Sequence, residues 1–412
     1  METPGSPPRK PTICFVSSMC LLDPVSGAAH SVRTILETLA QNGFSSFAYT
    51  ASLFDSNDEV SLAQFLGKNA SAPDAPGKLL RTTRNGVEHI VFLTKSSRGT
   101  SLNAEEQRSM RTKWQAQLER LRPDIVLSYG TSPLSRAMQT AARKAGAKVV
   151  FYLGNQEIKE TDFVRPGDTG VSPSKHLAAH YKERLGIETA VINPVIDPGR
   201  LVPEGAGLAA QAETRKLGFV TFINPLPHKG LTLLARLIQR ARSERPDMRF
   251  LVLEGRMPRR ILQNMKIDIA ALPNVWFLPE QQDMAAVYAR TSVLLVPSFW
   301  AEGFGRSVVE AQLSGIPVLA STRGGLPEAL GEGPQPLQVP QHCIDNHYAF
   351  PDAETVDRWW SALVRLWDDD DSYAQASALA RSAARPYAPN ETRARAVAHF
   401  RLVAGLTADA SR

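Results

Sequence analysis

A repeated alternation of short apolar runs with longer amphipathic runs constrains this chain more than any other feature. Helical apolar spacing separates the apolar runs of the first half, and Asn85-Gly86 predicts a hairpin turn between two further runs. Strands that alternate with helices form a parallel sheet covered on both faces. The apolar runs of the first half include TICFVSS (12–18), FSSFAYTA (44–51), DIVLSYG (124–130) and KVVFYLG (148–154).

The same alternation restarts after a stretch of different composition at residues 197–218, which is rich in Pro, Gly and Ala. We place a domain boundary there. The sequence therefore predicts an α/β protein with two doubly wound, Rossmann-like domains that face a cleft. We assign 12–197 to the first domain and 217–385 to the second, and expect a C-terminal helix in 386–412 to pack back on the first domain. Ligands of such sheets bind outside the carboxyl ends of the strands.

Charge and cysteine content narrow the class of partner. Lys plus Arg exceeds Asp plus Glu by 47 to 41 over 412 residues, and this scattered surplus favours an anionic substrate rather than nucleic acid. Three widely spaced cysteines and no apolar leader predict a reducing, cytoplasmic location. The basic run at 108–122 is a candidate for peripheral contact with acidic lipid at the inner face of a membrane, or is simply a solvated helix face.

The turn that follows VLLVPS (293–298) is the most informative stretch. The chain passes through Gly303, Phe304 and Gly305, and a helix is predicted to begin near Arg306 or Ser307. Free backbone N–H groups and the helix dipole make such a start an anion site, and glycine lets a phosphate approach the backbone. A plain loop glycine followed by an ordinary helix is the alternative.

Two glutamates flank this turn. Glu310 lies four residues after Arg306, so it shares a helix face with it, and its carboxylate can accept hydrogen bonds from a vicinal diol such as a ribose. Glu302 precedes the turn and can meet another hydroxyl-bearing ring. Phosphate would then occupy the helix start and hydroxyl groups would meet the acids. Glutamate near a helix start is also favoured by the dipole alone.

Two other strand-to-helix turns offer weaker signals. Lys229, in FINPLPHKGL (222–231), precedes Gly230 and a helix, where a lysine commonly contacts phosphate. Gly27 stands near the first helix of the first half and could let the backbone approach a diphosphate. This loop has no GxGxxG pattern, so we do not infer NAD.

The ordered set of these stretches resembles the GT-B fold glycosyltransferases, in particular the retaining family 4, the glycosyl transferases group 1. The resemblance is carried by PSFWAEGFGRSVVEAQLSGIPVLASTRGGLPEAL (297–330), with HKGLTLLARL, RFLVLEG and NVWFLPE upstream of it. TGVSPSKHLAAHYKERLG and TAVINPVID close the first half in the same order. The resemblance covers most of residues 170–335.

The resemblance implies transfer of a sugar from a UDP-, GDP- or dTDP-linked donor to a hydroxyl acceptor, with retention and without cofactor or bound metal. Glu310 would bind the ribose, while Glu302 and the backbone of Gly303–Gly305 would face the sugar. Lys229, with groups near Arg306 and Ser307, would hold the diphosphate. Gly27 would border it from the first domain, and the loop at 277–279 would lie near the base. The implied catalytic residues are Glu302, Lys229 and Asn155.

Departures from the family pattern identify further candidates. Ile223-Asn224 stands where the family has Gly-Arg, so Asn224 occupies the place of a phosphate-binding guanidinium. Arg256, Arg259 or Arg260 could compensate, or could be solvated surface residues. Asn155 follows the strand at 148–154 where the family often has a histidine, and could take over that sugar contact. The first glycine loop has Gly27-Ala28 in place of two glycines.

Two other functions fit the same fold. One is a sugar-nucleotide epimerase or phosphorylase, although no lysine in a pyridoxal-binding context is evident. The other is a catalytically degenerate subunit that binds a glycan, which the missing guanidinium and histidine favour. The presence of Glu302, Glu310 and Lys229 in this chain favours the transferase over both alternatives.

Overall fold

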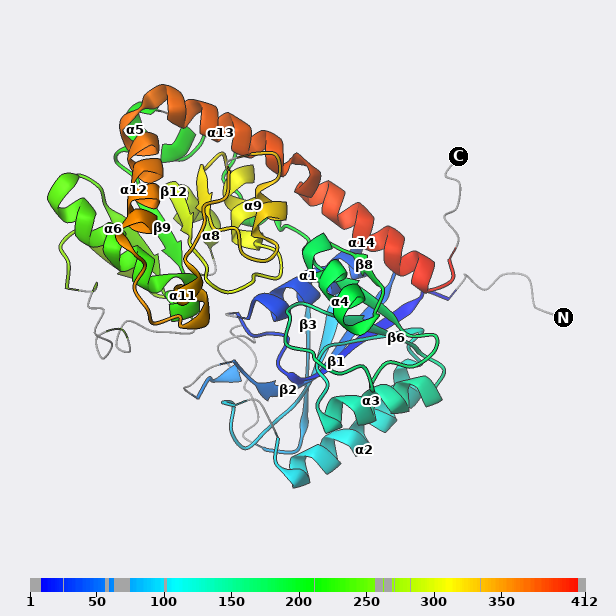
Figure 1. Ribbon diagram of the computed structural model, residues 1–412. Coiled ribbons are helices and arrows are strands. Elements are labelled where there is room, and N and C mark those ends of the chain that lie inside the picture. The colour runs from blue at the N-terminus through cyan, green and yellow to red at the C-terminus, as the bar shows by residue number, and fades with distance from the viewer. Residues whose placement is uncertain are drawn as a thin grey trace, which may run out of the picture. The chain divides into compact units, whose positions relative to one another are not determined.

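The computed structural model describes residues 9–24, 26–55, 59–62, 75–99, 102–210, 212–255, 262, 269, 271–281, 283–333 and 335–406. The contacts within the chain divide it into two compact units (Figure 1). Unit 1 contains the described residues up to Ser172, with His180–Val195 and Arg393–Arg412; unit 2 contains Pro173–Ala179 and Ile196–Thr392. The short segment Pro173–Ala179, which the sequence assigned to the first domain, thus groups with the second unit.

Unit 1 is built on an eight-stranded sheet in the order β3-β4-β2-β1-β5-β6-β7-β8. Every neighbouring pair is parallel except β3 and β4, which form an antiparallel hairpin. The left-handed φ angles of Asn85 (48°) and Gly86 (81°) confirm the predicted hairpin turn. The strands are β1 (Thr12–Met19), β2 (Ser45–Leu53), β3 (Leu79–Arg84), β4 (Val87–Phe92), β5 (Ile125–Ser128), β6 (Lys148–Tyr152), β7 (Thr169–Ser172) and β8 (Thr189–Val191).

Helices cover both faces of this sheet. Ile13 and Phe15 of β1 pack with apolar residues of α1 (Gly27–Gln41) and α14 (Pro389–Val403). On the other face, Tyr49 of β2 stacks on Trp114 of α2 (Ala104–Leu121). The Trp114 indole in turn donates to the carbonyl of Met138 in α3 (Pro133–Lys144), so that α2 and α3 pack together. Helix α4 (Lys175–Leu185) joins β7 to β8.

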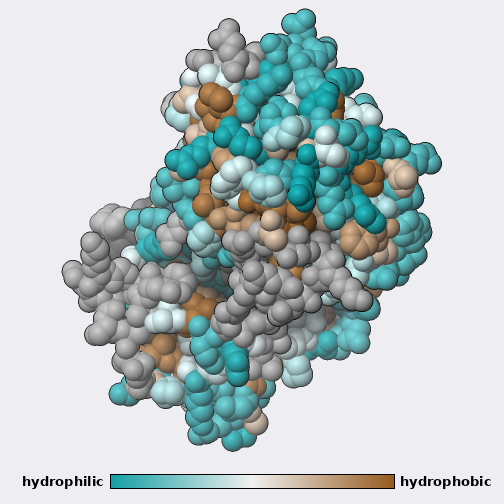
Figure 2. Space-filling view, turned by 90° about the vertical axis from the view of Figure 1, so that its left-hand side faces the viewer, coloured by the Kyte–Doolittle hydropathy of each residue, from teal (hydrophilic) through white to brown (hydrophobic). Residues whose placement is uncertain are grey.

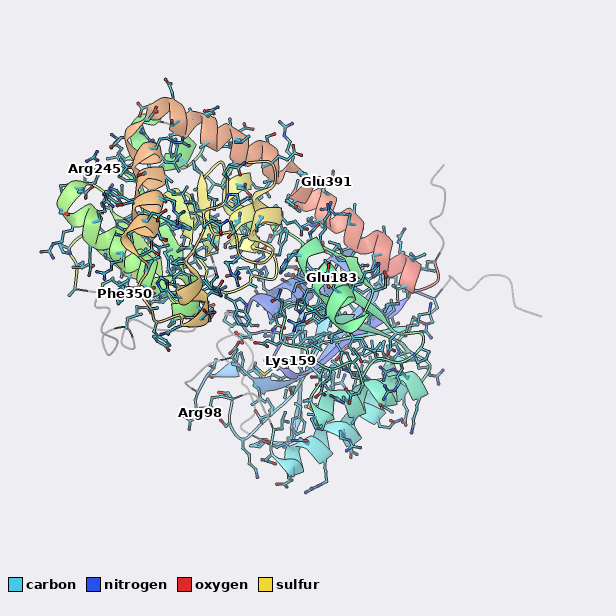
Figure 3. All side chains as sticks on the ribbon, in the orientation of Figure 1. Arg98, Lys159, Glu183, Arg245, Phe350 and Glu391 are labelled. Carbon is cyan, nitrogen blue, oxygen red and sulfur yellow. The ribbon has the colours of Figure 1, made fainter. Side chains whose placement is uncertain are left out.

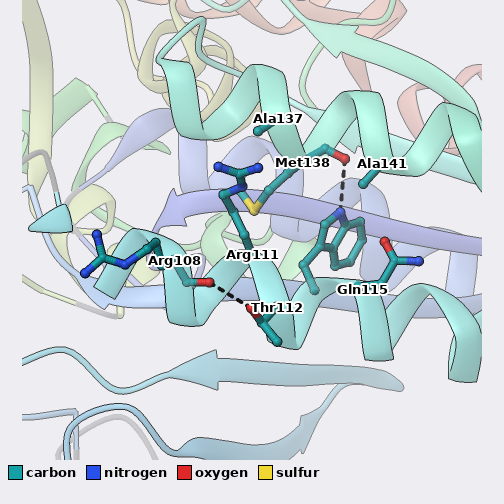
Figure 4. Close-up of a pocket in the computed structure, with 8 residues that line it drawn as sticks. Arg108, Arg111, Thr112, Gln115, Ala137, Met138 and Ala141 are labelled. Carbon is teal, nitrogen blue, oxygen red and sulfur yellow. Dashed lines mark hydrogen bonds between the residues drawn. The ribbon is translucent and has the colours of Figure 1, made fainter. Parts of the chain in front are cut away.

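A cavity of about 420 Å³ opens between α2 and α3. Figure 4 shows Arg111 of α2 reaching toward Ala137 and Met138 of α3, while Arg108 points away from them. Both arginines are exposed, and no acidic side chain lines the cavity among the described residues. This face of the helix pair is therefore positively charged over an apolar floor.

Unit 2 is built on a five-stranded, wholly parallel sheet in the order β11-β10-β9-β12-β13. The strands are β9 (Phe219–Ile223), β10 (Phe250–Leu253), β11 (Val275–Leu278), β12 (Thr291–Val296) and β13 (Val318–Ala320). The α-helices in the described part of this unit are α5 (Ala212–Arg215), α6 (Leu231–Glu244), α8 (Met284–Tyr288), α9 (Arg306–Leu313), α10 (Leu326–Leu330), α11 (Gln341–Asp345), α12 (Ala353–Asp368) and α13 (Asp370–Ala384). Because β9 and β12 are neighbours, the turns at their carboxyl ends lie at the same edge of the sheet.

Polar contacts around α12 and α13 support this core. Arg215 is buried, pairs with Asp370 at 2.5 Å, and donates to the carbonyl oxygens of Leu366 and Trp367. Asp369 caps α13 through the N–H groups of its first turn. By contrast, Arg245, labelled in Figure 3, pairs with Asp368 at the half-exposed end of α6.

The coloured residues of the face shown in Figure 2 are mainly hydrophilic, with hydrophobic side chains gathered in several places between them. Large apolar side chains that remain exposed include Leu217, Trp276, Tyr348 and Leu402. Within the described part of the chain, no helix combines the length and the apolar character needed to span a membrane.

Candidate donor-binding site

The turn between β12 and α9 contains the helix start that the sequence predicts. Gly305 is the N-cap residue, with φ of 119°, and α9 begins at Arg306 as expected. Among the described residues, no side chain caps this helix start. The N–H groups of its first turn and its dipole are therefore directed at the space in front of the helix, which is the geometry that favours an anion.

Gly324 and Gly325 hold this turn in place by close backbone packing. The N–H of Gly325 donates to the carbonyl oxygen of Glu302 at 2.7 Å, and the backbones of Glu302 and Gly324 form an isolated parallel β-bridge. A Cβ on Gly324 would lie 2.3 Å from that carbonyl oxygen, and one on Gly325 would lie 2.8 Å from the Cα of Phe304. Only glycines fit this cradle, so they fix the backbone on which Glu302 stands.

Lys229 reaches the same place from the turn after β9. It ends the 3₁₀ turn Pro227–Lys229, and the following Gly230 packs so closely that a Cβ would lie 2.1 Å from the Pro297 carbonyl oxygen. The Lys229 ammonium lies 2.6 Å from Glu302 Oε1, which also accepts a hydrogen bond of 2.8 Å from the Ser298 hydroxyl. The two sequence candidates that came from separate turns thus form one ion pair.

These contacts determine the direction in which the pKa of Glu302 is shifted. Burial acts to raise its pKa, but the Lys229 ammonium, the hydrogen bonds from Lys229 and Ser298, and the charge of His228 outweigh burial and lower it. The carboxylate is therefore ionised at neutral pH, as an acceptor of hydroxyl hydrogen bonds. The side chain of Glu302 is 15% exposed and that of Lys229 is 26% exposed, so both are accessible to a ligand.

Glu310 is more deeply placed than the sequence suggests. Its side chain is only 1% exposed and contacts three protein side chains. Arg200 donates to both carboxylate oxygens, at 2.9 and 3.4 Å, and the Tyr288 hydroxyl donates to Oε2 at 2.9 Å. Arg306 lies 3.3 Å from Oε1, which confirms that Arg306 and Glu310 share a helix face.

Asn224 adopts a left-handed backbone conformation with φ of 62°. Its Oδ1 is buried and has no hydrogen-bond partner among the described residues, and it lies 2.8 Å from where a Cβ of Gly255 would stand. Arg256, Arg259 and Arg260, which we considered as replacements for the missing guanidinium, lie outside the described residues.

The remaining candidates, Gly27 and Asn155, belong to unit 1. Gly27 is the first residue of α1, and a Cβ on it would meet no atom within 4 Å. Asn155 follows β6; its amide donates to Glu157 at 2.8 Å, and its carbonyl oxygen accepts a hydrogen bond from Tyr181. The roles assigned to these two residues stay predictions.

Several residues of the site were missed by sequence reasoning. They are Arg200, Tyr288, Ser298, Gly324 and Gly325, together with Ser174, whose hydroxyl donates to the Gly303 carbonyl oxygen at 2.6 Å. The paired glycines of STRGG were the one visible signal, because adjacent glycines in a loop indicate close backbone approach. Arg200 and Tyr288 carry no local signal, since their partner lies 110 and 22 residues away.

Parts of the chain are similar to known proteins. Residues 214–369 match the family model described as Glycosyl transferases group 1. A D-inositol 3-phosphate glycosyltransferase of Mycobacteroides abscessus is 32% identical over 228 residues, which are 48% of this chain and 50% of that protein. One from Mycolicibacterium smegmatis is 29% identical over 56% of this chain and 54% of its own length. The chain thus spans about half the length of these curated relatives.

Solved structures match almost the whole chain. Sucrose-phosphate synthase from Thermosynechococcus elongatus has a TM-score of 0.70 at 16% identity, covering 97% of this chain and 100% of its own. Anabaena HepE in complex with UDP and glucose has a TM-score of 0.66 at 15% identity, covering 94% and 98%. The predicted GT-B fold, with parallel-sheet Rossmann-like domains, is therefore confirmed.

Proposed function

We propose that this protein is a glycosyltransferase that moves a sugar from a nucleotide diphosphate sugar to a hydroxyl acceptor, with retention and without a bound metal. One observation carries the proposal: the Lys229–Glu302 ion pair stands beside the open start of α9, and Glu310 follows on the same helix. The match of residues 214–369 to the group 1 family supports it. Because HepE was solved in complex with UDP and glucose, UDP-sugars are the first donors to test, ahead of GDP- and dTDP-sugars.

In this proposal the diphosphate lies against the start of α9. The helix dipole, the first-turn N–H groups from Arg306 and Ser307, and the Lys229 ammonium all act on negative charge there. The same groups stabilise the charge that develops when the bond between the sugar C1 and the phosphate oxygen breaks. This supply of positive charge from the chain is the physical reason for proposing that no metal is required.

The reaction joins the acceptor oxygen to C1 on the face that the diphosphate leaves. The acceptor hydroxyl proton passes to the departing phosphate oxygen, and the electron pair of the broken bond stays on that oxygen. Glu302, ionised and held by Lys229 and Ser298, accepts hydrogen bonds from the donor sugar. Glu310 accepts hydrogen bonds from the ribose hydroxyl groups.

Binding measurements on two variants test these roles. We expect Glu310→Ala to weaken binding of every nucleoside diphosphate, because the ribose is common to all of them. Glu302→Ala is expected to weaken binding of the intact donor and to leave the free nucleoside diphosphate almost unaffected. If both variants bind and turn over donors as the wild type does, the assigned roles are wrong.

Retention is tested by the product. Proton NMR of the newly formed glycoside gives the anomeric configuration from the H1–H2 coupling. We expect the configuration of the donor, and an inverted product would contradict the front-face mechanism. Full activity after treatment with EDTA is expected if the chain alone neutralises the diphosphate, and loss that Mg²⁺ restores would contradict it.

Incubation with nucleotide sugars, with and without an acceptor, distinguishes a transferase from the two alternative functions. An epimerase would convert the donor into another nucleotide sugar without an acceptor, and a phosphorylase would need inorganic phosphate. A degenerate binding subunit would retain a glycan without releasing nucleotide. The Lys229–Glu302 pair favours transfer over binding alone, because a charged pair at an anion site serves the leaving diphosphate.

We further propose that α2 makes a peripheral contact with acidic lipid. Arg108 and Arg111 stand exposed at the cavity between α2 and α3 and share no ion pair among the described side chains (Figure 4). The double substitution Arg108→Glu and Arg111→Glu is expected to reduce cosedimentation with vesicles of anionic lipid. Unchanged cosedimentation, or equal binding of the wild type to neutral vesicles, would contradict the contact.

A further inference from the structure

The carboxylate of Glu310 is held from three separate elements. Arg200 belongs to the 3₁₀ turn Pro198–Arg200 just after β8, Tyr288 ends α8, and Arg306 begins α9. The backbone adds to this arrangement, because the N–H of Val202 donates to the Ser314 hydroxyl, and that hydroxyl donates to the Glu310 carbonyl oxygen. The segment that carries Arg200 is thus fastened along α9.

The acceptor positions of this carboxylate are nearly all filled by fixed donors. A carboxylate offers about four lone-pair positions on its two oxygens. Arg200 uses one on each oxygen, and the buried Tyr288 hydroxyl uses the second position of Oε2. The remaining position is on Oε1, where Arg306 Nε at the helix start makes an ion pair at 3.3 Å that a ligand hydroxyl would share. A ligand hydroxyl at Glu310 therefore has one defined place of attachment, next to the anion site.

The charges agree with a fixed, ionised carboxylate. A carboxylate that is 1% exposed requires compensation, which the adjacent Arg200 and Arg306 guanidinium groups provide. Although burial disfavours the charged guanidinium, the Glu310 carboxylate raises the pKa of Arg200. Burial, and then the Glu310 charge, raise the pKa of Tyr288 well above its ordinary value, so Tyr288 stays a hydrogen-bond donor.

We propose that Arg200 and Tyr288 are positioning residues that fix the rotation of the Glu310 carboxylate and so determine how strongly the protein recognises the ribose hydroxyls of its donor. This inference rests on the proposed function, because it takes Glu310 as the ribose contact. Without Arg200 or Tyr288, the carboxylate turns, the defined position on Oε1 is lost, and the discrimination between ribose and deoxyribose falls.

The test compares each nucleoside diphosphate with its 2′-deoxy and 3′-deoxy forms by isothermal titration calorimetry. UDP and GDP are the first probes, with the tighter binder carried forward. A hydrogen bond to a charged group predicts that the wild type prefers the ribose form by about 10-fold or more. Glu310→Ala should bring the ratio of the two dissociation constants close to one. Arg200→Ala and Tyr288→Phe should each lower the ratio by about threefold or more, and Arg200→Lys should restore part of it.

Two matched controls lie in the same unit. Arg245, at the half-exposed end of α6, donates to the Asp368 carboxylate through Nε and Nη2, the same two nitrogens that Arg200 uses (Figure 3). Tyr373 is buried and donates its hydroxyl to the Ser292 carbonyl oxygen at 2.9 Å, like Tyr288 to Glu310. Arg245→Ala and Tyr373→Phe should keep the wild-type ratio. Tyr288→Phe removes a single oxygen, so the test stands even if Arg200→Ala does not fold.

The outcomes separate this inference from the function beneath it. Equal loss of affinity for the ribose and deoxyribose forms would show that Arg200 and Tyr288 act only on stability and would overturn the inference. If Glu310→Ala loses the discrimination while Arg200→Ala and Tyr288→Phe retain it, the ribose role of Glu310 stands and the positioning role is wrong. Failure of the wild type to bind any nucleoside diphosphate overturns both.

Discussion

The Lys229 ammonium lies 2.6 Å from Glu302 Oε1, although the two residues stand 73 positions apart in the chain. They meet because β9 and β12 are neighbours in a parallel sheet, which brings the turns after the two strands to one edge. Gly230 against Pro297 and Gly324 against Glu302 bring the backbones close enough for the pair to form. We propose that Lys229 serves two partners, the carboxylate beside it and the diphosphate of the proposed donor.

Replacing Lys229 should therefore weaken binding through the diphosphate group and leave binding through the nucleoside almost unchanged. Lys229→Met removes one charged donor, so we expect the nucleoside diphosphate to bind about 10- to 100-fold more weakly. Binding of the unphosphorylated nucleoside should change little. Titration calorimetry of both ligands checks this, with Lys216→Met as an exposed control in the same unit. Equal weakening of nucleoside and diphosphate would remove Lys229 from the phosphate contact.

Gly324→Ala should disturb the Glu302 turn more than an ordinary glycine substitution. Gly324 has φ of 63°, and its added Cβ would meet the Glu302 backbone at 2.3 Å; Gly205 has φ of 79° but no atom within 4 Å. We expect Gly205→Ala to cost about 1 kcal/mol for its backbone conformation and Gly324→Ala to cost about 3 kcal/mol. Urea unfolding measures both costs. Nucleotide affinity should fall only for Gly324→Ala, and similar behaviour of the two variants would contradict the cradle.

His89 should make the stability of the protein depend on pH. It is fully buried in β4, neither ring nitrogen has a partner among the described residues, and burial, with Arg33 and Arg84 in the same direction, lowers its pKa to about 4. Between pH 6.5 and 4 the unfolded chain binds a proton that the folded chain does not, so stability falls as pH falls through this window. The loss at pH 5 is about 2 kcal/mol relative to pH 7.

Comparison with a variant isolates this contribution. His89→Phe keeps a ring in the core but does not titrate, so its unfolding free energy should fall less than that of the wild type between pH 7 and pH 5. Urea unfolding at the two pH values gives the difference. An identical fall in both proteins would show that His89 does not carry the pH dependence.

We expect the buried Arg215 to contribute strongly to the free energy of unfolding of unit 2. Its side chain is 2% exposed, and its guanidinium donates hydrogen bonds to two carbonyl oxygens at the end of α12. The guanidinium also lies 5.1 Å from the centre of the Tyr373 ring. Arg215→Ala removes these donors and leaves a cavity, so we expect unfolding to become easier by about 2–4 kcal/mol. Arg245→Ala, at a half-exposed pair, should cost under about 1 kcal/mol. Equal costs would contradict the packing role of Arg215.

Local patterns in the sequence predicted the strands, the helices and the turns that carry the candidate site residues. The turn after β12, the start of α9 at Arg306 and the Asn85-Gly86 hairpin each depend on neighbouring residues, so a short window of sequence is enough to predict them. The resemblance to the group 1 family joined these pieces in their correct order.

The environment of Glu310 could not be predicted in this way. Its exposure and partners depend on how the segment with Arg200 runs along α9 and how Tyr288 is placed by α8, and neither is encoded near Glu310 itself. The sequence predicted a carboxylate that can accept hydrogen bonds from a diol, but not that packing leaves its side chain only 1% exposed beside Arg200 and Arg306. Likewise, the need for glycine at 324 becomes visible only when the Glu302 backbone lies against it.

Protein-dependent release of nucleoside diphosphate from a panel of UDP-, GDP-, dTDP- and ADP-sugars tests the central claim most directly. The wild type should bind and cleave at least one donor, slowly with water and faster with a matching hydroxyl acceptor. Lys229→Met and Glu302→Ala should each reduce the rate at least about 10-fold. Absence of binding and release with every donor in the panel would contradict the assignment of this site to a nucleotide sugar.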